Sequence, residues 1–354
     1  MLDMENIKNN LSAVLHKPLD IRLENRPVRN PAKGEVLLSM RSVGICGTDI
    51  EVWHSGNAGG FGILPTVMGH EGSGVICAIG EGVTNVKVGD RVALMGGDSC
   101  EKCDLCKDGK FNLCSEWGSN FPWDFLARYA IHTRAEQCFK LADHVSFDEG
   151  ALAEPLAVAT RTCTRAGITV GDNVLVCGAG SVGLLCMMVS KAMGAATVCV
   201  TDINQSKLDL AKKLGANFTV LATGSSSDVK NKVTDAIGCM PDRSVECSAA
   251  EASVRAAILS TKSGGTVTLV GLSNNEMTLP IVNAATREVD ILGVLAYTRK
   301  DYASAVSLMA TGRVNVKPLI THTFKLEDTL KAYELVKNQE DGVVKTIIRC
   351  NDFE

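Results

Sequence analysis

The pattern of apolar and polar positions changes character near residue 155. Before that point, short runs rich in β-branched residues are separated by Gly, Asp and Asn, and they predict strands at 35–43, 75–79 and 91–94. After it, apolar runs alternate with segments of helix length. These runs predict six strands, at 174–177, 198–201, 218–220, 245–247, 267–270 and 291–294. Strands that alternate with helices in this way are typical of a parallel, doubly wound sheet.

Glycines mark the ends of two helices in the second half. A helix from Ser181 is expected to end at Gly194, and one from Ser206 at Gly215. After residue 294 the alternation gives way to a helical stretch at 301–311 and a strand at 343–349. The sequence therefore predicts an α/β protein with a β-rich first domain, a doubly wound second domain and a separate C-terminal segment.

Composition narrows the class of protein. The chain has 354 residues, of which 45% are hydrophobic and 21% charged, as in ordinary globular proteins of more than one domain. The net charge is −4 and there is no run of Lys and Arg, which argues against a nucleic-acid partner. The polar N-terminus predicts no signal peptide, and glycines interrupt the uncharged stretch 174–190, so no membrane span is expected. We expect a cytoplasmic protein.

Fourteen cysteines without a secretion signal indicate free thiols in a reducing compartment. Seven lie in apolar runs and are expected to be small core residues, namely Cys77, Cys163, Cys177, Cys186, Cys199, Cys239 and Cys247. Four others share a polar 15-residue window, namely Cys100, Cys103, Cys106 and Cys114. Four thiolates at this spacing can close a tetrahedral shell around a structural zinc ion. A surface loop with reactive thiols is the alternative.

A second set of metal-ligand residues precedes this window. Cys46 is followed by the adjacent pair His70 and Glu71. Three ligands leave a position open for water or a substrate oxygen, as in a catalytic zinc site. The alternative for His70 and Glu71 is a buried, hydrogen-bonded pair.

A glycine-rich turn follows the first strand of the doubly wound half. Gly178 would make the tight turn, Gly180 would let a pyrophosphate approach the backbone, and Gly183 would allow close helix–strand packing. Asp202 follows the third glycine by 19 residues, at the end of the next predicted strand. Its carboxylate can accept hydrogen bonds from the ribose hydroxyls of NAD and would repel the 2′-phosphate of NADP. The Lys207 side chain either contacts the edge of the bound adenosine or is an ordinary solvent-exposed lysine of a helix.

Together these motifs resemble the zinc-dependent medium-chain dehydrogenases. The resemblance rests on Gly69-His70-Glu71, on Cys46-Gly47-Thr48-Asp49, on the four-cysteine window and on the glycine-rich turn. Within that family the chain is most similar to the polyol dehydrogenase branch, which includes the sorbitol dehydrogenases. Four stretches carry this similarity, namely 149–156, 191–195, 287–291 and 314–319.

The resemblance implies a GroES-like catalytic domain at 1–157, completed by 297–354, and a Rossmann NAD-binding domain at 158–296. It also implies one catalytic and one structural zinc ion per subunit, NAD as the cofactor and a homotetramer. Further cofactor contacts would come from Val182, Gly271, Leu272, Val294, Leu295 and Ala296. The substrate would be a small alcohol or polyol, with Glu154 and Tyr297 close to it.

The family's roles transfer to matching residues. Cys46, His70 and Glu71 would hold the catalytic zinc. Glu154 would order a water molecule or contact the substrate. Thr48 would pass on the hydroxyl proton, and Asp49 would orient His70, although local turn chemistry could also explain these last two residues. Zinc would then favour the alkoxide, which transfers a hydride to the nicotinamide; the reverse reaction reduces a ketose.

The sequence departs from the polyol pattern where the substrate is held. Val52 and Ala296 stand where the family commonly has a tyrosine and an arginine, and the loop 117–123 differs as well. Fewer hydrogen-bond donors should weaken selectivity for polyols. Three hypotheses follow: a polyol dehydrogenase, the same chemistry on another secondary alcohol or on L-threonine, and a non-catalytic protein that kept the fold.

Overall fold

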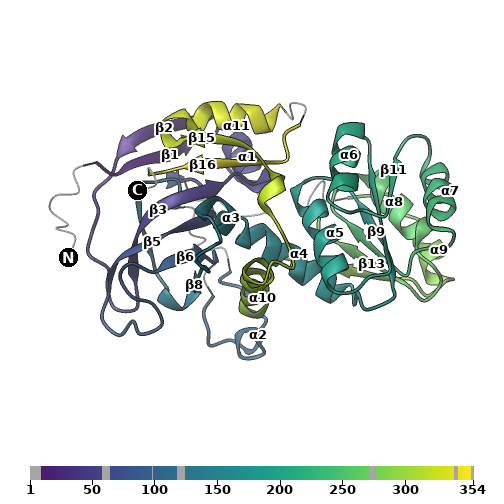
Figure 1. Ribbon diagram of the computed structural model, residues 1–354, viewed down its shortest axis with the longest axis horizontal. Helices are drawn as coiled ribbons and strands as arrows, with labels where there is room; N and C mark the ends of the chain where they lie inside the picture. Colours follow the sequence, from purple (N-terminus) through teal and green to yellow (C-terminus); the bar gives the residue numbers. More distant parts are fainter. Residues whose placement is uncertain are drawn as a thin grey trace. The chain divides into compact units, whose positions relative to one another are not determined.

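The structure is a computed structural model that describes residues 9–57, 64–97, 99–117, 124–271, 276–338 and 342–351. The chain divides into two compact units. One consists of residues 1–154 and 298–354, and the other of residues 155–297. In Figure 1 the first unit is drawn mainly in purple, blue and yellow, and the second in teal and green.

The second unit is built on a parallel sheet of six strands in the order β11-β10-β9-β12-β13-β14. The strands are β9 (Asn173–Cys177), β10 (Thr197–Asp202), β11 (Phe218–Leu221), β12 (Arg243–Glu246), β13 (Thr266–Leu269) and β14 (Asp290–Gly293). All six predicted strands are present, and their ends agree with the prediction to within two residues. The predicted doubly wound sheet is confirmed.

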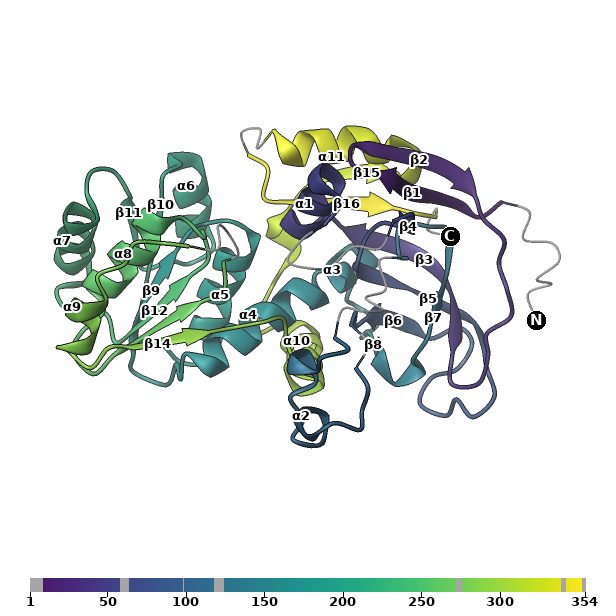
Figure 2. The same ribbon diagram turned by 180° about the vertical axis from the view of Figure 1, so that it is seen from behind.

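Helices cover both faces of this sheet. Figures 1 and 2 show α5 (Ser181–Ala192) and α6 (Gln205–Lys213) on one face, with α7 (Ser226–Ile237) and α8 (Glu251–Ser260) on the other. The short helix α9 (Ile281–Ala285) precedes β14. The chain winds outward from β9 to β11 and then returns to β12 on the other side of β9. The carboxyl ends of β9 and β12 therefore form a switch point, where open α/β sheets bind ligands.

The first unit is mainly β-structure. Its larger sheet has the order β15-β16-β3-β5-β6-β8, with β7 paired to β3, and a smaller sheet has the order β2-β1-β4. The large sheet contains β3 (Val36–Gly44), β5 (Glu71–Ile79), β6 (Arg91–Leu94), β7 (Tyr129–His132), β8 (Cys138–Lys140), β15 (Ile320–Lys325) and β16 (Lys345–Arg349). The small sheet contains β1 (Leu11–Lys17), β2 (Asp20–Asn25) and β4 (Thr66–Val67). The predicted strands correspond to β3, β5, β6 and β16, and the others were not predicted.

The C-terminal segment completes this larger sheet. The helices of the first unit are α1 (Gly47–Ser55), α2 (Asp104–Lys107), α3 (Phe147–Ala151), α10 (Arg299–Ala310) and α11 (Thr329–Lys337), while α4 (Ala153–Arg165) spans the boundary between the units. Strand β16 pairs antiparallel with β3, so that Ile347 lies opposite Gly44. Residues from the end of the chain thus lie beside the start of the first domain (Figure 1).

Among the helices that the structure describes, none has the length and apolar character needed to cross a bilayer.

One prediction about the cysteines was wrong. Cys163, Cys177, Cys186 and Cys199 are buried as expected, and Cys77 and Cys247 are half-buried, but Cys239 is exposed. Its apolar neighbours belong to the end of α7, where Gly238 adopts the left-handed conformation and turns the chain out of the helix. The apolar run therefore ends at the surface and does not continue into the core.

Candidate metal centres and cofactor site

The four predicted zinc cysteines meet in one loop of the first unit. Their sulfur atoms all lie within 4.8 Å of one another. Cys103 caps the N-terminus of α2, Cys106 lies within that helix, and Cys114 follows the short 3-10 helix Phe111–Leu113. Hydrogen bonds from the backbone amides of Lys102 and Cys103 lower the pKa of the Cys100 thiol to about 6. Four sulfurs at this spacing, one of them favoured as a thiolate, match the donor set of a closed zinc site.

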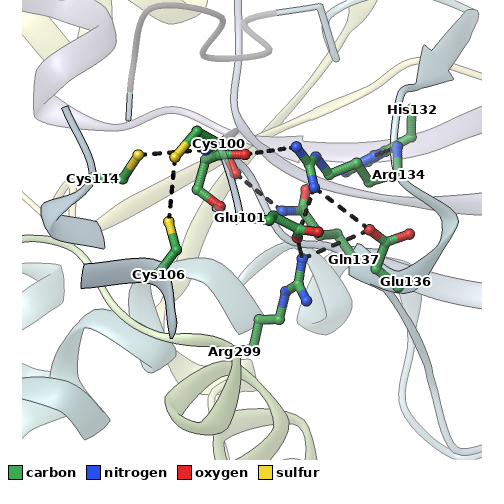
Figure 3. Close-up of polar contacts among 11 residues, drawn as sticks. Cys100, Glu101, Cys106, Cys114, His132, Arg134, Glu136, Gln137 and Arg299 are labelled. Carbon is green, nitrogen blue, oxygen red and sulfur yellow. Dashed lines mark hydrogen bonds and ion pairs between the residues drawn. The ribbon is translucent and has the colours of Figure 1, made fainter. Parts of the chain in front are cut away.

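A network of ion pairs holds this loop in place (Figure 3). Arg134 Nη1 lies 2.7 Å from Glu101 Oε1, and Arg134 Nη2 donates to the carbonyl of Ser99 at 2.7 Å. Arg299, from the first turn of α10, contacts the same Glu101 carboxylate. Both guanidinium groups also lie 3.7 Å from Glu136 Oε1. The loop is therefore fixed both by the segment after β7 and by the C-terminal part of the unit.

The second predicted group, Cys46, His70 and Glu71, also comes together. One ligand atom of each residue lies within 4.8 Å of the other two. Cys46 follows β3, whereas His70 and Glu71 stand at the start of β5, which pairs antiparallel with β3. His70 and Glu71 are buried and Cys46 is half-buried. A thiol, an imidazole and a carboxylate form a mixed donor set that suits zinc and leaves a coordination position open.

Asp49 links two members of this group. Its Oδ1 lies 3.1 Å from His70 Nδ1, and its Oδ2 accepts a hydrogen bond from the backbone N–H of Cys46 at 2.9 Å. Burial by itself lowers the pKa of His70, but the Asp49 carboxylate outweighs it, so the pKa is raised. Because Nδ1 faces Asp49, a metal would bind His70 through Nε2. The hydroxyl of Thr48 lies 3.6 Å from the Cys46 sulfur.

A residue that the sequence did not reveal belongs to the same group. The ammonium of Lys345, in β16, lies 2.8 and 2.7 Å from the two carboxylate oxygens of Glu71. Burial lowers the pKa of Lys345, but the charges of Glu71, Cys46 and Glu154 outweigh it, so the pKa is raised. Glu154 is buried in the first turn of α4, near enough to act on Lys345, but it is not in the three-residue ligand group. The sequence feature that could have revealed Lys345 is a single lysine within the apolar run 343–348.

The glycine-rich turn has the geometry of a phosphate site. A Cβ on Gly183 would lie 1.9 Å from the carbonyl oxygen of Gly178, so α5 can approach β9 this closely only without a side chain there. A Cβ on Gly180 would meet no described atom within 4 Å. Gly180 is also the N-cap of α5 and has no side chain to cap the first N–H groups of the helix. Open space above uncapped N–H groups fits a pyrophosphate.

Asp202 is fixed beside this turn. Its Oδ2 accepts a hydrogen bond from the Ala179 N–H at 2.7 Å, and its Oδ1 accepts one from the Asn204 N–H at 2.8 Å. Lys207 is half-buried in the first turn of α6. Ile203, which the sequence argument did not single out, is 82% exposed next to Asp202. Such an exposed apolar side chain could contact the adenine base of the cofactor. The sequence feature that could have revealed it is its position directly after Asp202.

The other predicted cofactor residues gather at the same edge of the sheet. Val182 is in α5, Gly271 follows β13, and Val294, Leu295 and Ala296 follow β14. The carboxyl ends of parallel strands share one edge, which places these residues with the glycine-rich turn. Tyr297 is fully buried. Leu272 lies outside the described residues, as does most of the loop 117–123.

Comparisons with known proteins agree with this geometry. Residues 32–143 match the alcohol dehydrogenase GroES-like domain, and residues 181–311 match the zinc-binding dehydrogenase domain. Sorbitol dehydrogenase from Gallus gallus is 46% identical over 347 residues, which cover 97% of each chain.

Two solved structures are similar throughout. An Escherichia coli alcohol dehydrogenase in complex with NADH has a TM-score of 0.88 at 26% identity, covering 96% of this chain and 99% of that one. A Sinorhizobium meliloti zinc-binding dehydrogenase bound to NADP has a TM-score of 0.87 at 26% identity, with the same coverage. The chain belongs to the sorbitol dehydrogenase family of zinc-binding dehydrogenases, which are oxidoreductases that use zinc and a nicotinamide cofactor.

Proposed function

We propose that the protein is an NAD- and zinc-dependent dehydrogenase that interconverts a polyol, such as sorbitol or xylitol, and its ketose. The observation that carries this proposal is the open group of Cys46, His70 and Glu71 in a chain so similar to sorbitol dehydrogenases. A structural protein that merely kept the fold would not need an open three-ligand site, which argues against the non-catalytic alternative.

The proposed roles follow from the contacts. A zinc ion held by Cys46, His70 and Glu71 would supply Lewis acidity that lowers the pKa of a substrate hydroxyl. Asp49 holds the His70 imidazole through Nδ1, so Nε2 is the nitrogen that would bind the zinc ion. Thr48 is placed beside the Cys46 sulfur, where its hydroxyl can accept a proton from an alcohol and donate its own onward. Buried Glu154 would order water or bind a substrate hydroxyl.

The remaining details are part of the proposal. The four-cysteine loop would hold a second, structural zinc ion, which is supported by its four clustered sulfurs. Glu154, Tyr297 and the residues around the glycine-rich turn would bind substrate and NAD as the family resemblance implies. A homotetramer is likewise expected from that resemblance, and a cytoplasmic location is expected from the fourteen cysteines.

A second candidate substrate class has a specific observation in its favour. Val52 is fully buried in α1 and contributes to the apolar core of the first unit. Neither its side chain nor that of Ala296 can donate a hydrogen bond to a hydroxyl. A site with fewer donors discriminates less between a polyol and a simpler alcohol. The same chemistry on another secondary alcohol or on L-threonine is therefore the alternative.

NAD-dependent oxidation of a panel of alcohols tests the proposal. The panel contains sorbitol, xylitol, ribitol, L-threonine and simple secondary alcohols, and the enzyme is loaded with zinc. We expect turnover of the polyols, and we expect it to be lost in Glu71→Ala. Turnover of threonine or secondary alcohols with inert polyols would favour the alternative substrate class. A protein that turns over none of them, while binding zinc and NAD, would contradict the proposal.

Replacing Asp202 is expected to change the choice of cofactor. In Asp202→Asn the amide oxygen can accept only one of the two backbone hydrogen bonds, and the negative charge near the ribose is gone. A hydrogen bond to a charged group contributes about 1.5–3 kcal/mol, so we expect the ratio of kcat/KM with NAD to that with NADP to fall roughly 10- to 100-fold. The measurement is steady-state kinetics with both cofactors, and exposed Asp209→Asn in α6 is the matched control. An unchanged ratio would show that Asp202 does not select the cofactor.

A further inference from the structure

The contact between Lys345 and Glu71 joins distant parts of the chain inside the first unit. The ammonium also donates to the backbone carbonyl of Ile45 at 3.1 Å. The side chains of Lys345 and Glu71 are 2% and 1% exposed. Water therefore does not screen this pair, and both carboxylate oxygens face the same ammonium.

The strand order explains how the two side chains meet. Strand β3 lies between β16 and β5, and Gly44 in β3 is directly opposite Glu71. A Cβ on Gly44 would lie 2.1 Å from Glu71 Oε2. The missing side chain at Gly44 leaves the space that the Glu71 carboxylate occupies, and Lys345 reaches it from the other neighbour of β3.

This arrangement constrains the Glu71 carboxylate. A buried ammonium without a partner is strongly unfavourable, so Lys345 must keep a carboxylate within reach. A carboxylate has about four lone-pair positions, and one ammonium leaves some of them free for a metal. Lys345 thus fixes where the carboxylate lies without using up its capacity as a ligand.

We propose that Lys345 is a positioning residue that holds Glu71 beside Cys46 and His70, so that the C-terminal strand β16 completes the open metal site. This inference rests on the proposed function, because it takes Glu71 to be a zinc ligand. Lys345 acts through Glu71 and does not touch the metal. Groups of this kind, which orient a ligand, typically change metal affinity 10- to 100-fold when they are replaced.

Zinc affinity of the purified full-length protein is the test. Competition with a chromophoric chelator resolves the release of each zinc equivalent, and Glu71→Gln identifies the step that belongs to this site. We expect Lys345→Met to lower the zinc affinity measured in that step 10- to 100-fold. The affinity measured in the other step should be unchanged. Lys345→Gln, which keeps a donor but no charge, should weaken it less. Exposed Lys331→Met in α11 is the control and should behave like the wild type.

A double-mutant cycle separates positioning from a general loss of structure. If Lys345 acts through Glu71, Lys345→Met should have little further effect on zinc affinity in the Glu71→Gln background. The visible spectrum of the cobalt-substituted protein should also change in Lys345→Met, because the ligand field depends on where the carboxylate lies. If Lys345→Met does not fold, Lys345→Gln takes its place in the same double-mutant cycle.

The possible failures are distinct. Lys345 variants with wild-type zinc affinity and cobalt spectrum would overturn the positioning role while leaving Glu71 as a ligand. Equal effects of Lys345→Met with and without Glu71 would also overturn it. If Glu71→Gln itself left zinc affinity unchanged, the metal site of the proposed function would be wrong, and the inference about Lys345 would fall with it.

Discussion

Replacing Cys46 by serine is expected to lower kcat/KM about 10³-fold while leaving the fold intact. The thiolate would be lost as a zinc ligand, and the Lewis acidity of zinc contributes several kcal/mol, with about 1.4 kcal/mol for each factor of ten. Serine is among the best N-cap residues, so the start of α1 should be preserved. Asp49 can still accept a hydrogen bond from the backbone N–H at position 46, because that contact does not involve the thiol.

Steady-state kinetics and zinc content, measured on the same preparation, check this prediction. Cys77→Ser is the matched control. Cys77 is also a half-buried cysteine of the first unit, but it lies outside both metal-ligand groups. The control should keep its activity and its zinc. If Cys46→Ser kept wild-type activity and zinc content, Cys46 would not be a ligand and the open site would have to be reassigned.

The features that the sequence and the structure have in common rest on signals that lie close together in the sequence. The six strands of the doubly wound sheet were visible because each is an apolar run bounded by turn residues. The glycine-rich turn was visible because its three glycines fall within six residues, and the clash of a Cβ on Gly183 with Gly178 shows why a side chain is excluded there. The four-cysteine loop was visible for the same reason, since its ligands share one short segment.

Several features that depend on contacts between distant segments were not predicted. Lys345 meets Glu71 across 274 residues of sequence, and only the pairing of β16 and β5 on either side of β3 brings them together. The hairpin of β1 and β2 was missed because β2 has no fully buried residue and so lacks a buried apolar face. Cys239 was misplaced because an apolar run at a helix end resembles one that continues into the core. In each case tertiary packing decided the outcome, and the local pattern did not.

The four-cysteine loop is expected to stabilise the first unit through its metal. Burial raises the pKa of Cys106 to about 12, whereas that of Cys100 is about 6. At neutral pH Cys100 is therefore largely ionised, but Cys106 must lose a proton before it can bind zinc. Because binding releases protons, zinc affinity at this loop should rise with pH over the neutral range.

Replacing Cys106 by serine is expected to remove one zinc equivalent per subunit and to lower the thermal midpoint of unfolding. A ligand that binds only the folded state stabilises that state, so losing the metal removes its whole contribution. Adding a chelator to the wild type should also lower its midpoint as this site is emptied. Exposed Cys239→Ser is the control and should keep both zinc equivalents.

The ion pairs around the loop make this prediction specific. Glu101, Arg134 and Arg299 anchor the loop by contacts that do not involve sulfur, so Cys106→Ser should lose stability without losing these anchors. The open site uses different residues, so the folded variant should retain its second zinc ion and its turnover at moderate temperature. Calorimetry, zinc analysis and kinetics on one preparation give all three values. An unchanged zinc content and midpoint would instead favour a surface loop of reactive thiols, and the ion pairs alone would then account for its fixed position.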